Sequence, residues 1–225
     1  MATAASRARR VRRRPEVARG EILEAAAPEF AEHGFEGARL EKIAARAEIN
    51  VSLIYHYFAN KEDLFIAVLE EAYARMRDYA QDTAIRARDP VTAMVEFVRA
   101  RFRIFLERPE LVGLLNAENV HKAVHIAKSE KIAGLYGPLI AELDALLARG
   151  AAAGVFRPGI DATELFITIN AIGYFYLSNR YTLGVVLSTD LTAPDRVARR
   201  ESHIVEVVLA VLRPEPATPD ASPRA

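Results

Sequence analysis

The sequence predicts an all-α protein in which a small N-terminal domain of three helices precedes a larger helical domain. Apolar residues recur at helical spacing along most of the 225 residues, and glycine and proline lie mainly where these segments end. Two short helical segments follow each other closely within residues 38–57. The length alone also allows one compact all-α unit. We expect a basic arm at residues 1–14, the small domain at 15–75, the larger domain at 76–212 and a disordered tail at 213–225.

The first long helix is expected to run from Pro15 to His33, with Gly34 just beyond its C-terminus. Pro28 lies inside this helix and has no N–H to donate to the carbonyl group of Glu24. Because that hydrogen bond is missing, the sequence predicts a kink at Pro28.

Residues 38–57 predict two short amphipathic helices joined by a tight turn. The first helix has an apolar stripe at i, i+3, i+4 and i+7, formed by Leu40, Ile43, Ala44 and Ala47. Asn50 is a good N-cap, so a second helix can begin at Val51. In that helix we expect an inward face of Ile54, Tyr55 and Phe58 and an outward face of Ser52, Leu53, His56 and Tyr57. This is the geometry of a helix-turn-helix, whose second helix enters the major groove of DNA.

The spacing alone also fits an ordinary helical hairpin of an all-α domain, and the flanking sequence decides between the two interpretations. Residues 19–65 resemble the TetR family of bacterial transcriptional regulators. The shared elements are ILEAA at 22–26, FAEHGF at 30–35, IA at 43–44, Ile54-Tyr55, Phe58, and Lys61 followed by Leu64. The resemblance implies an N-terminal three-helix helix-turn-helix DNA-binding domain and a C-terminal helical ligand-binding and dimerisation domain. It further implies a repressor that releases a palindromic operator when a small molecule binds the C-terminal domain.

The chain departs from the family pattern at several positions. Ala38 and Arg39 stand where a Ser or Thr usually opens the helix, so a hydroxyl cap is lost, although a guanidinium can contact a phosphate. Glu48 replaces the usual glycine of the turn, and a residue with a side chain at positive φ costs about 1 kcal/mol there. Ser52 and Tyr57 replace a common Gly and His, which can alter the DNA sequence that is read.

We expect the DNA interface on and around the second short helix. Candidates to anchor phosphates are Arg39, Tyr57 and Lys61. Candidates to read base edges are Ser52, Leu53 and His56, and Tyr55 is expected to be shared between core and interface. The full expected set is Arg39, Lys42, Asn50, Val51, Ser52, Leu53, Tyr55, His56, Tyr57 and Lys61.

The formal net charge is zero, which by itself argues against DNA binding, but the charge is unevenly distributed. Seven arginines precede residue 20, and Glu16 is the only acidic residue among them. Such an arm can lie along phosphates or enter the minor groove. The alternative is a solvated tail that does nothing.

Further helices are expected at Lys61–Ala87, Val91–Glu107, Pro109–Ala117, Val124–Ala153, Asp161–Leu187 and Ala193–Leu212. Residues 165–177 are apolar nearly all round, and the last helix carries a stripe of Val197, Ile204, Val205, Val208 and Leu212. Helices this apolar must be buried on two sides, either in the domain core or against a second subunit. The resemblance implies a symmetric homodimer formed through the last two helices.

Polar side chains among apolar neighbours in the middle of the chain are candidates for ligand binding, because a ligand pocket is apolar with a few convergent hydrogen-bonding groups. Asn170 is the leading candidate, since it lies one turn before Tyr174 in the most apolar helix. For each candidate, the alternative is a surface residue or a satisfied polar residue of the core. The expected set is Phe102, Asn119, His121, Asn170 and Tyr174.

A helical-bundle metal protein or enzyme is the alternative functional class. Glu118, His121 and His125 have the spacing of three metal ligands on one helix face. Di-iron bundles, however, need such a motif twice together with two further glutamates, and the sequence has it once. The sequence also contains no phosphate-binding loop, nucleophile elbow or zinc-protease motif. We therefore expect no catalysis, no cofactor and no metal.

Composition supports the same interpretation. There is no cysteine, so disulfides and thiolate chemistry are excluded. Residues 1–15 lack the apolar segment of a secretory signal, and no apolar run reaches the ~18 residues that span a bilayer. We expect a cytoplasmic homodimer that binds double-stranded DNA and a small-molecule effector, with no membrane partner.

Overall fold

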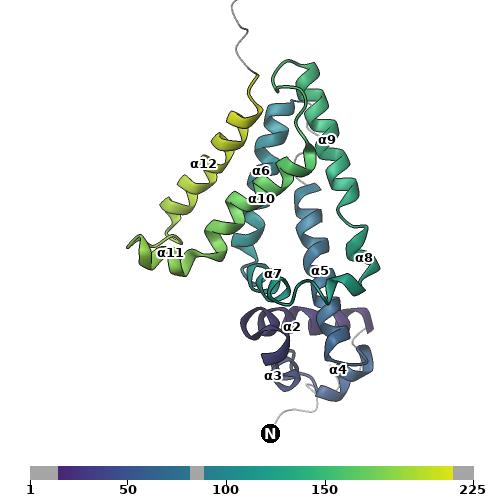
Figure 1. Cartoon of the computed structure of the whole chain (residues 1–225). Helices are drawn as coiled ribbons and strands as arrows, with labels where there is room; N and C mark the ends of the chain where they lie inside the picture. Colours follow the sequence, from purple (N-terminus) through teal and green to yellow (C-terminus); the bar gives the residue numbers. More distant parts are fainter. Residues whose placement is uncertain (1–14, 82–88, 215–225) are drawn as a thin grey trace, which may run out of the picture. The chain divides into compact units, whose positions relative to one another are not determined.

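The computed structural model describes residues 15–81 and 89–214, and all regular structure in these ranges is helical (Figure 1). The expected basic arm at 1–14 and most of the expected tail at 213–225 lie outside the described residues. None of the helices in the described ranges is both long enough and apolar enough to cross a membrane.

The chain forms two compact units. Unit 1 contains the N-terminal residues up to Met76 together with Glu107–Leu135, and unit 2 contains Arg77–Leu106 together with the chain from Tyr136 onward. The chain therefore passes between the units three times. This grouping differs from the division expected from the sequence, in which 76–212 forms one domain, because residues 107–135 pack with the N-terminal helices.

Unit 1 contains the two short helices expected from the sequence. Its elements are α2 (Pro15–Gly37), α3 (Leu40–Arg46), α4 (Val51–Tyr57), the first part of α5 (Lys61–Gln81), α7 (Glu110–Val120), the 3₁₀ turn η2 (Ile126–Lys128) and α8 (Glu130–Ala133). The backbone of α2 leaves the helical region at Gly34, where φ is 65° and ψ is −177°. The break lies at the residue that the sequence places just beyond the helix C-terminus, because glycine reaches this region without a Cβ clash. Pro28 lies within the helical part of α2, and the kink expected there stays a prediction.

Unit 2 is a bundle formed by α6 (Pro90–Glu107, whose last residue belongs to unit 1), α9 (Gly137–Ala152), α10 (Ala162–Ser178), α11 (Arg180–Val186) and α12 (Pro194–Leu212). Its core contains large side chains with almost no exposed area, among them Met94, Phe97, Phe102, Leu139, Leu143 and Ile169. Four apolar residues of the expected stripe on α12, Ile204, Val205, Val208 and Leu212, are buried in this unit. The large apolar side chains left exposed on α10 and α11 include Ile167, Phe175, Tyr181, Val185 and Val186.

Two of the expected long helices are divided. The expected Val124–Ala153 helix is wrong: the Ser129 side chain accepts a hydrogen bond from Ile132 N and caps α8, and α9 begins separately with proline in its first turn. Proline is favoured in a first turn and disfavoured in a helix interior, which explains the division. The expected Asp161–Leu187 helix is likewise interrupted at Asn179, although Asp161 does cap α10 by accepting from Glu164 N.

Helices α2 and α7 approach each other closely in unit 1. A Cβ atom built on Gly113 of α7 would lie 2.4 Å from the carbonyl oxygen of Ala31 in α2, which is far inside van der Waals contact. Only glycine fits at this crossing. The close approach fixes α7, and with it the segment that follows, against the first helix.

We expect Gly113→Ala to lower the free energy of unfolding by about 1–3 kcal/mol, because α7 must move away from α2 to accept a methyl group. A matched control is Gly20→Ala, since Gly20 is an exposed residue of α2 with no atom within 4 Å of its Cβ position. That control should raise stability by up to about 1 kcal/mol through helix propensity. Denaturant unfolding measures both, and a Gly113→Ala protein as stable as the parent contradicts the packing.

Candidate nucleic-acid interface

Helices α3 and α4 are joined by a tight turn. The turn is closed by hydrogen bonds from Ala47 N to Ile43 O and from Ile49 N to Ala44 O, each 2.9 Å long. Glu48 has a φ of 53°, so a residue with a side chain occupies the left-handed conformation that the sequence predicted for this position. The side chain of Asn50 accepts from Ser52 N at 3.0 Å, which confirms Asn50 as the N-cap of α4.

The inward faces of the two helices hold them together. Ile43 and Ala44 of α3 are 0% and 3% exposed, and Ile54 of α4 and Phe58 after it are 1% and 4% exposed. Tyr55 does not join them. Its side chain is 55% exposed, so the expectation that it faces inward is wrong. On a seven-residue helix, Ile54 and Phe58, four positions apart, already define the buried face, and Tyr55 lies about 100° away from Ile54.

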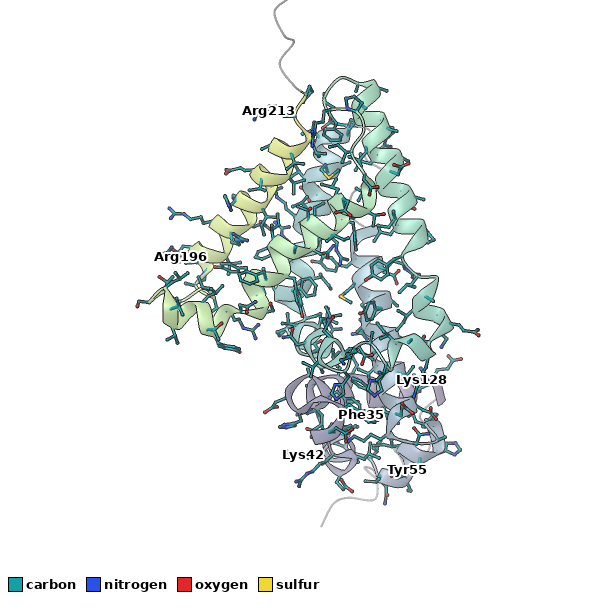
Figure 2. The ribbon with its side chains drawn as sticks, in the orientation of Figure 1. Phe35, Lys42, Tyr55, Lys128, Arg196 and Arg213 are labelled. Carbon is teal, nitrogen blue, oxygen red and sulfur yellow. The ribbon has the colours of Figure 1, made fainter. Side chains whose placement is uncertain are left out.

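The outward face of α4 therefore consists of Ser52, Tyr55 and His56, which are exposed, flanked by half-buried Val51, Leu53 and Tyr57. The rings of His56 and Tyr57 meet edge to face with centroids 5.1 Å apart. In Figure 2, Tyr55 and Lys42 both point outward at the end of unit 1 formed by α3 and α4. This face is short and largely polar, as suits a recognition helix.

Arg39 is the N-cap residue of α3, and its side chain makes no capping hydrogen bond. Its backbone N–H instead donates to the Glu29 carboxylate at 3.2 Å, and Glu29 is only 1% exposed. A buried acid on α2 thus fixes the start of α3 where the family uses a hydroxyl residue. The Arg39 guanidinium itself remains exposed.

Lys61 begins α5 and is held close to the end of α2. Its ammonium group donates to the carbonyl of Glu36 at 3.1 Å and lies 5.1 Å from the centre of the Phe35 ring. Arg19, which we grouped with the basic arm from the sequence, has a defined position in the structure. Arg19 lies on α2 with its guanidinium 5.2 Å from the centre of the Phe58 ring, directly after α4. Nothing in the local sequence signalled that contact.

Comparison with known proteins identifies these elements. Residues 22–68 match the model of the bacterial regulatory proteins of the tetR family, and residues 90–208 match the tetracyclin repressor-like C-terminal domain. The second match alone covers more than half of the chain. This chain belongs to the TetR family. TetR-family members are ligand-responsive DNA-binding repressors, and this chain is a DNA-binding transcriptional regulator of that kind.

Individual TetR-family relatives match over nearly their full length. The chain is 36% identical over 195 residues to the HTH-type transcriptional repressor NicS of Pseudomonas putida, covering 87% of this chain and 92% of NicS. It is 28% identical over 199 residues to the HTH-type transcriptional regulator RutR of Escherichia coli, covering 86% and 89%. The solved structure of SCO4942 from Streptomyces coelicolor superposes with a TM-score of 0.66 at 26% identity, covering 88% and 99%.

The expected ligand-binding residues fall into different units of this TetR-family chain. Asn119 and His121 lie at the end of α7 in unit 1, where Asn119 donates to Leu115 O and His121 donates to Ala117 O. Phe102, Asn170 and Tyr174 lie in unit 2. Neither unit by itself brings the five residues together. The sequence expectation grouped them because spacing gave no signal that residues 107–135 pack with the N-terminal helices.

Asn170 has a structural partner that the sequence did not reveal. Its carboxamide oxygen accepts from Nε and Nη2 of Arg101 on α6, at 3.1 Å and 2.7 Å, and its amide group donates to Phe166 O. The Arg101 guanidinium also lies 5.3 Å from the centre of the Phe166 ring. Burial lowers the pKa of Arg101, and the hydrogen bond to Tyr136 offsets only part of that effect. Asn170 therefore stabilises a buried cation between α6 and α10.

Glu118 and His125, two of the alternative metal ligands, pair with each other. His125 Nδ1 donates to Glu118 Oε2 at 2.8 Å, and both side chains are buried. His121 instead donates to a backbone carbonyl. Within the described ranges, no group of three or more His, Asp or Glu side chains is arranged to hold a metal. The motif thus has a structural role here, because the chain reverses direction after α7 and carries His125 back to Glu118.

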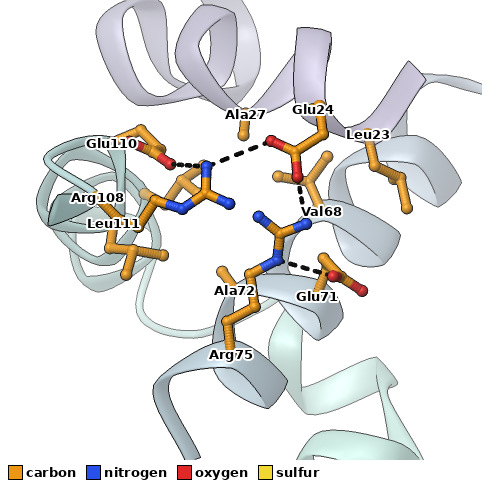
Figure 3. A pocket seen from close by; sticks show the side chains of 11 residues that line it. Leu23, Glu24, Ala27, Val68, Glu71, Ala72, Arg75, Arg108, Glu110 and Leu111 are labelled. Carbon is orange, nitrogen blue, oxygen red and sulfur yellow. Dashed lines mark hydrogen bonds and ion pairs between the residues drawn. The ribbon is translucent and has the colours of Figure 1, made fainter. Parts of the chain in front are cut away.

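Behind the helix-turn-helix, α2, α5 and α7 are linked by an ion cluster centred on Glu24 (Figure 3). The Glu24 carboxylate contacts the guanidinium groups of Arg75 on α5 and of Arg108 just before α7. Glu71 and Glu110 complete the pairs with these arginines, at 2.8 Å and 3.5 Å. Burial acts to raise the pKa of Glu24, but the two arginines lower it by more, so it lies below its ordinary value of 4.5.

Because the pKa of Glu24 is depressed in the folded protein, the unfolded chain binds more protons as the pH falls. The stabilisation that the Glu24 carboxylate gives the folded protein is present above the pKa of Glu24 in the unfolded chain. It is lost as the pH falls through the pKa of Glu24 in the folded protein. We expect Glu24→Gln to lower the free energy of unfolding near pH 7, with the deficit shrinking below about pH 4.5. Asp144→Asn, at an exposed site on α9, is the control. A deficit that does not change with pH would show that the Glu24 charge is not responsible.

Proposed function

We propose that this chain represses transcription by binding a palindromic operator as a homodimer, with α4 in the major groove, and that a small molecule bound to unit 2 releases it. The observation that carries the proposal is the outward face of α4, which is capped by Asn50 and lies between two helices that carry cationic residues, Arg39 at the start of α3, Lys42 on α3 and Lys61 at the start of α5. Binding to chromosomal DNA would place the protein in the cytoplasm.

Base reading on this face would fall to Ser52, Leu53 and His56, with Tyr55 available in addition because its ring is exposed. None of these is an Arg, Asn or Gln, the residues that make the usual bidentate contacts to guanine and adenine. Selectivity would therefore rely on apolar contact of Leu53 with thymine methyl groups and on single hydrogen bonds. Phosphate anchoring would come from Arg39 at the start of α3, Tyr57 at the end of α4 and Lys61 at the start of α5.

Dimerisation would use the apolar side chains that unit 2 leaves exposed. Ile167 and Phe175 of α10 are 54% and 57% exposed, and they lie two turns apart on the same face with Ala171 between them. A face of this kind suits a two-fold contact with a second copy. In such a dimer the two copies of α4 must lie about 34 Å apart to enter successive major grooves.

Effector binding is proposed for unit 2, where Phe102 and Tyr174 each pack against another aromatic ring. The Tyr174 ring is 5.5 Å from the Phe105 ring, and the Phe102 ring is 6.3 Å from the Tyr176 ring. A ligand that prefers one arrangement of unit 2 can act on unit 1 through three covalent crossings rather than through α5 alone.

We expect Lys61→Ala to weaken binding to all DNA sequences and to reduce the slope of log affinity against log salt by about one, because one phosphate contact is lost. Arg213→Ala removes a positive charge at the end of α12 and is the control for net charge. Fluorescence anisotropy over a salt series measures both slopes. An unchanged slope with altered sequence preference would assign Lys61 to base reading instead.

We expect Phe175→Glu to raise the dimer dissociation constant by about tenfold or more, because the carboxylate would be buried at the two-fold contact without a partner. Val120→Glu, at a 78% exposed position in unit 1, is the matched control and should leave the dimer intact. Sedimentation equilibrium measures the dissociation constant. Equal dimer stability in the two variants would remove the α10 face from the interface.

A further inference from the structure

The segment between α7 and α8 lies far from α4 in sequence, yet it contacts the residues that hold Lys61. Glu118, near the end of α7, is 2% exposed. Its Oε1 atom accepts from the backbone N–H groups of His125 and Ile126, at 2.8 Å and 3.0 Å. One carboxylate therefore fixes both the backbone at the start of η2 and, through Oε2, the ring of His125.

His125, 4% exposed, is packed between two aromatic rings. Its centroid is 4.6 Å from that of Phe35, at the end of α2, and 4.9 Å from that of Phe65, in the first part of α5. Phe35 and Phe65 also touch each other, with centroids 5.5 Å apart. The Phe35 side chain is half-buried, whereas Lys42 and Tyr55 are exposed (Figure 2). The position of the Phe35 ring thus depends on His125.

Phe35 in turn supports Lys61. The ammonium group of Lys61 lies 5.1 Å from the centre of the Phe35 ring, within the range of a cation–π contact, and donates to the carbonyl of the next residue, Glu36. Three successive contacts therefore lead from Glu118 to His125, to Phe35 and to the proposed phosphate anchor. All four residues belong to unit 1.

The same segment is held to α5 at two further points. Lys128 pairs with Glu62, the residue next to Lys61, at 2.5 Å. The Glu70 carboxylate accepts from Ser129 Oγ at 2.8 Å and from Lys131 Nζ at 2.7 Å. These contacts join the 125–131 segment to the first half of α5, which Lys61 begins.

We propose that Glu118 and His125 are positioning residues for DNA binding, which set the Phe35 ring and so the place of the Lys61 ammonium group. The inference rests on the proposed role of Lys61 as a phosphate anchor. It assigns to residues outside the helix-turn-helix a direct effect on the strength of phosphate contact. A change that moves the 121–129 segment therefore alters DNA affinity without touching α4.

A double-mutant cycle tests the proposal with sheared genomic DNA as the probe, because a phosphate contact is independent of sequence. In the parent protein, His125→Ala should weaken binding by about tenfold and reduce the salt slope by up to about one. In a Lys61→Ala protein, the same His125→Ala change should have little further effect. Non-additivity of this kind is not expected of a substitution that only destabilises the fold.

Two further variants keep the result interpretable if His125→Ala folds poorly. Glu118→Gln keeps an oxygen for the two backbone N–H groups and removes the charge that holds the ring, so it should weaken DNA binding in the same Lys61-dependent way. Val120→Ala changes a 78% exposed residue on α7 and should leave binding unchanged. Free energies of unfolding, measured in parallel, identify variants that have lost the fold.

The outcomes separate the two proposals. If Lys61→Ala leaves the salt slope unchanged, the phosphate-anchor role of Lys61 fails. If Lys61→Ala reduces the slope but the effects of His125→Ala and Glu118→Gln add to it in full, the positioning role fails while the anchor role stands. Loss of the His125→Ala and Glu118→Gln effects in the Lys61→Ala background supports the positioning role.

Discussion

The organisation of unit 1 depends on one close contact, that between Gly113 of α7 and the backbone of Ala31 in α2. Since the helices approach too closely for any side chain at residue 113, α7 can only pack where its backbone meets the first helix. That constraint places Glu118 and the turn after it near the end of α2, and it brings Arg108 to Glu24. The ion cluster at Glu24 and the contact of Phe35 with His125 near the end of α2 both follow from the same crossing.

The recognition element itself is held by very few residues. Two seven-residue helices are too short to be stable alone, so their positions derive from the burial of Ile43, Ile54 and Phe58 against the rest of unit 1. Glu48 in the left-handed region opposes this stability, whereas the Asn50 cap and the bond from Arg39 N to the buried Glu29 favour it. The outward face of α4 can vary in sequence because the inward face and these backbone contacts fix the geometry.

Local signals predicted the helix-turn-helix well. The i, i+3, i+4 spacing, the Asn50 cap and the turn at Glu48 are all confirmed, because each depends on residues only a few positions apart. The DNA-contacting residues stay a prediction. The orientation of Tyr55, the division of the expected Val124–Ala153 helix and the Arg101–Asn170 contact were missed or wrong, since each is decided by tertiary packing or by competing helix starts. The grouping of residues 107–135 with the N-terminal helices likewise rests on a glycine whose partner lies more than 80 positions away.

The chain passes between the two units three times, and this limits how parts of this protein can be joined to parts of a relative. A chimaera that joins the first 75 residues of this protein to the remainder of a relative would keep α2 but replace α7, so the relative must itself supply a glycine where α7 meets the backbone of Ala31. His125, which packs against Phe35, would be replaced in the same exchange. Grafting a new operator specificity therefore calls for transplanting residues 107–135 together with the N-terminal helices, or for changing only the outward face of α4. The part that must be exchanged as a whole is unit 1, which is encoded by two separate stretches of the gene.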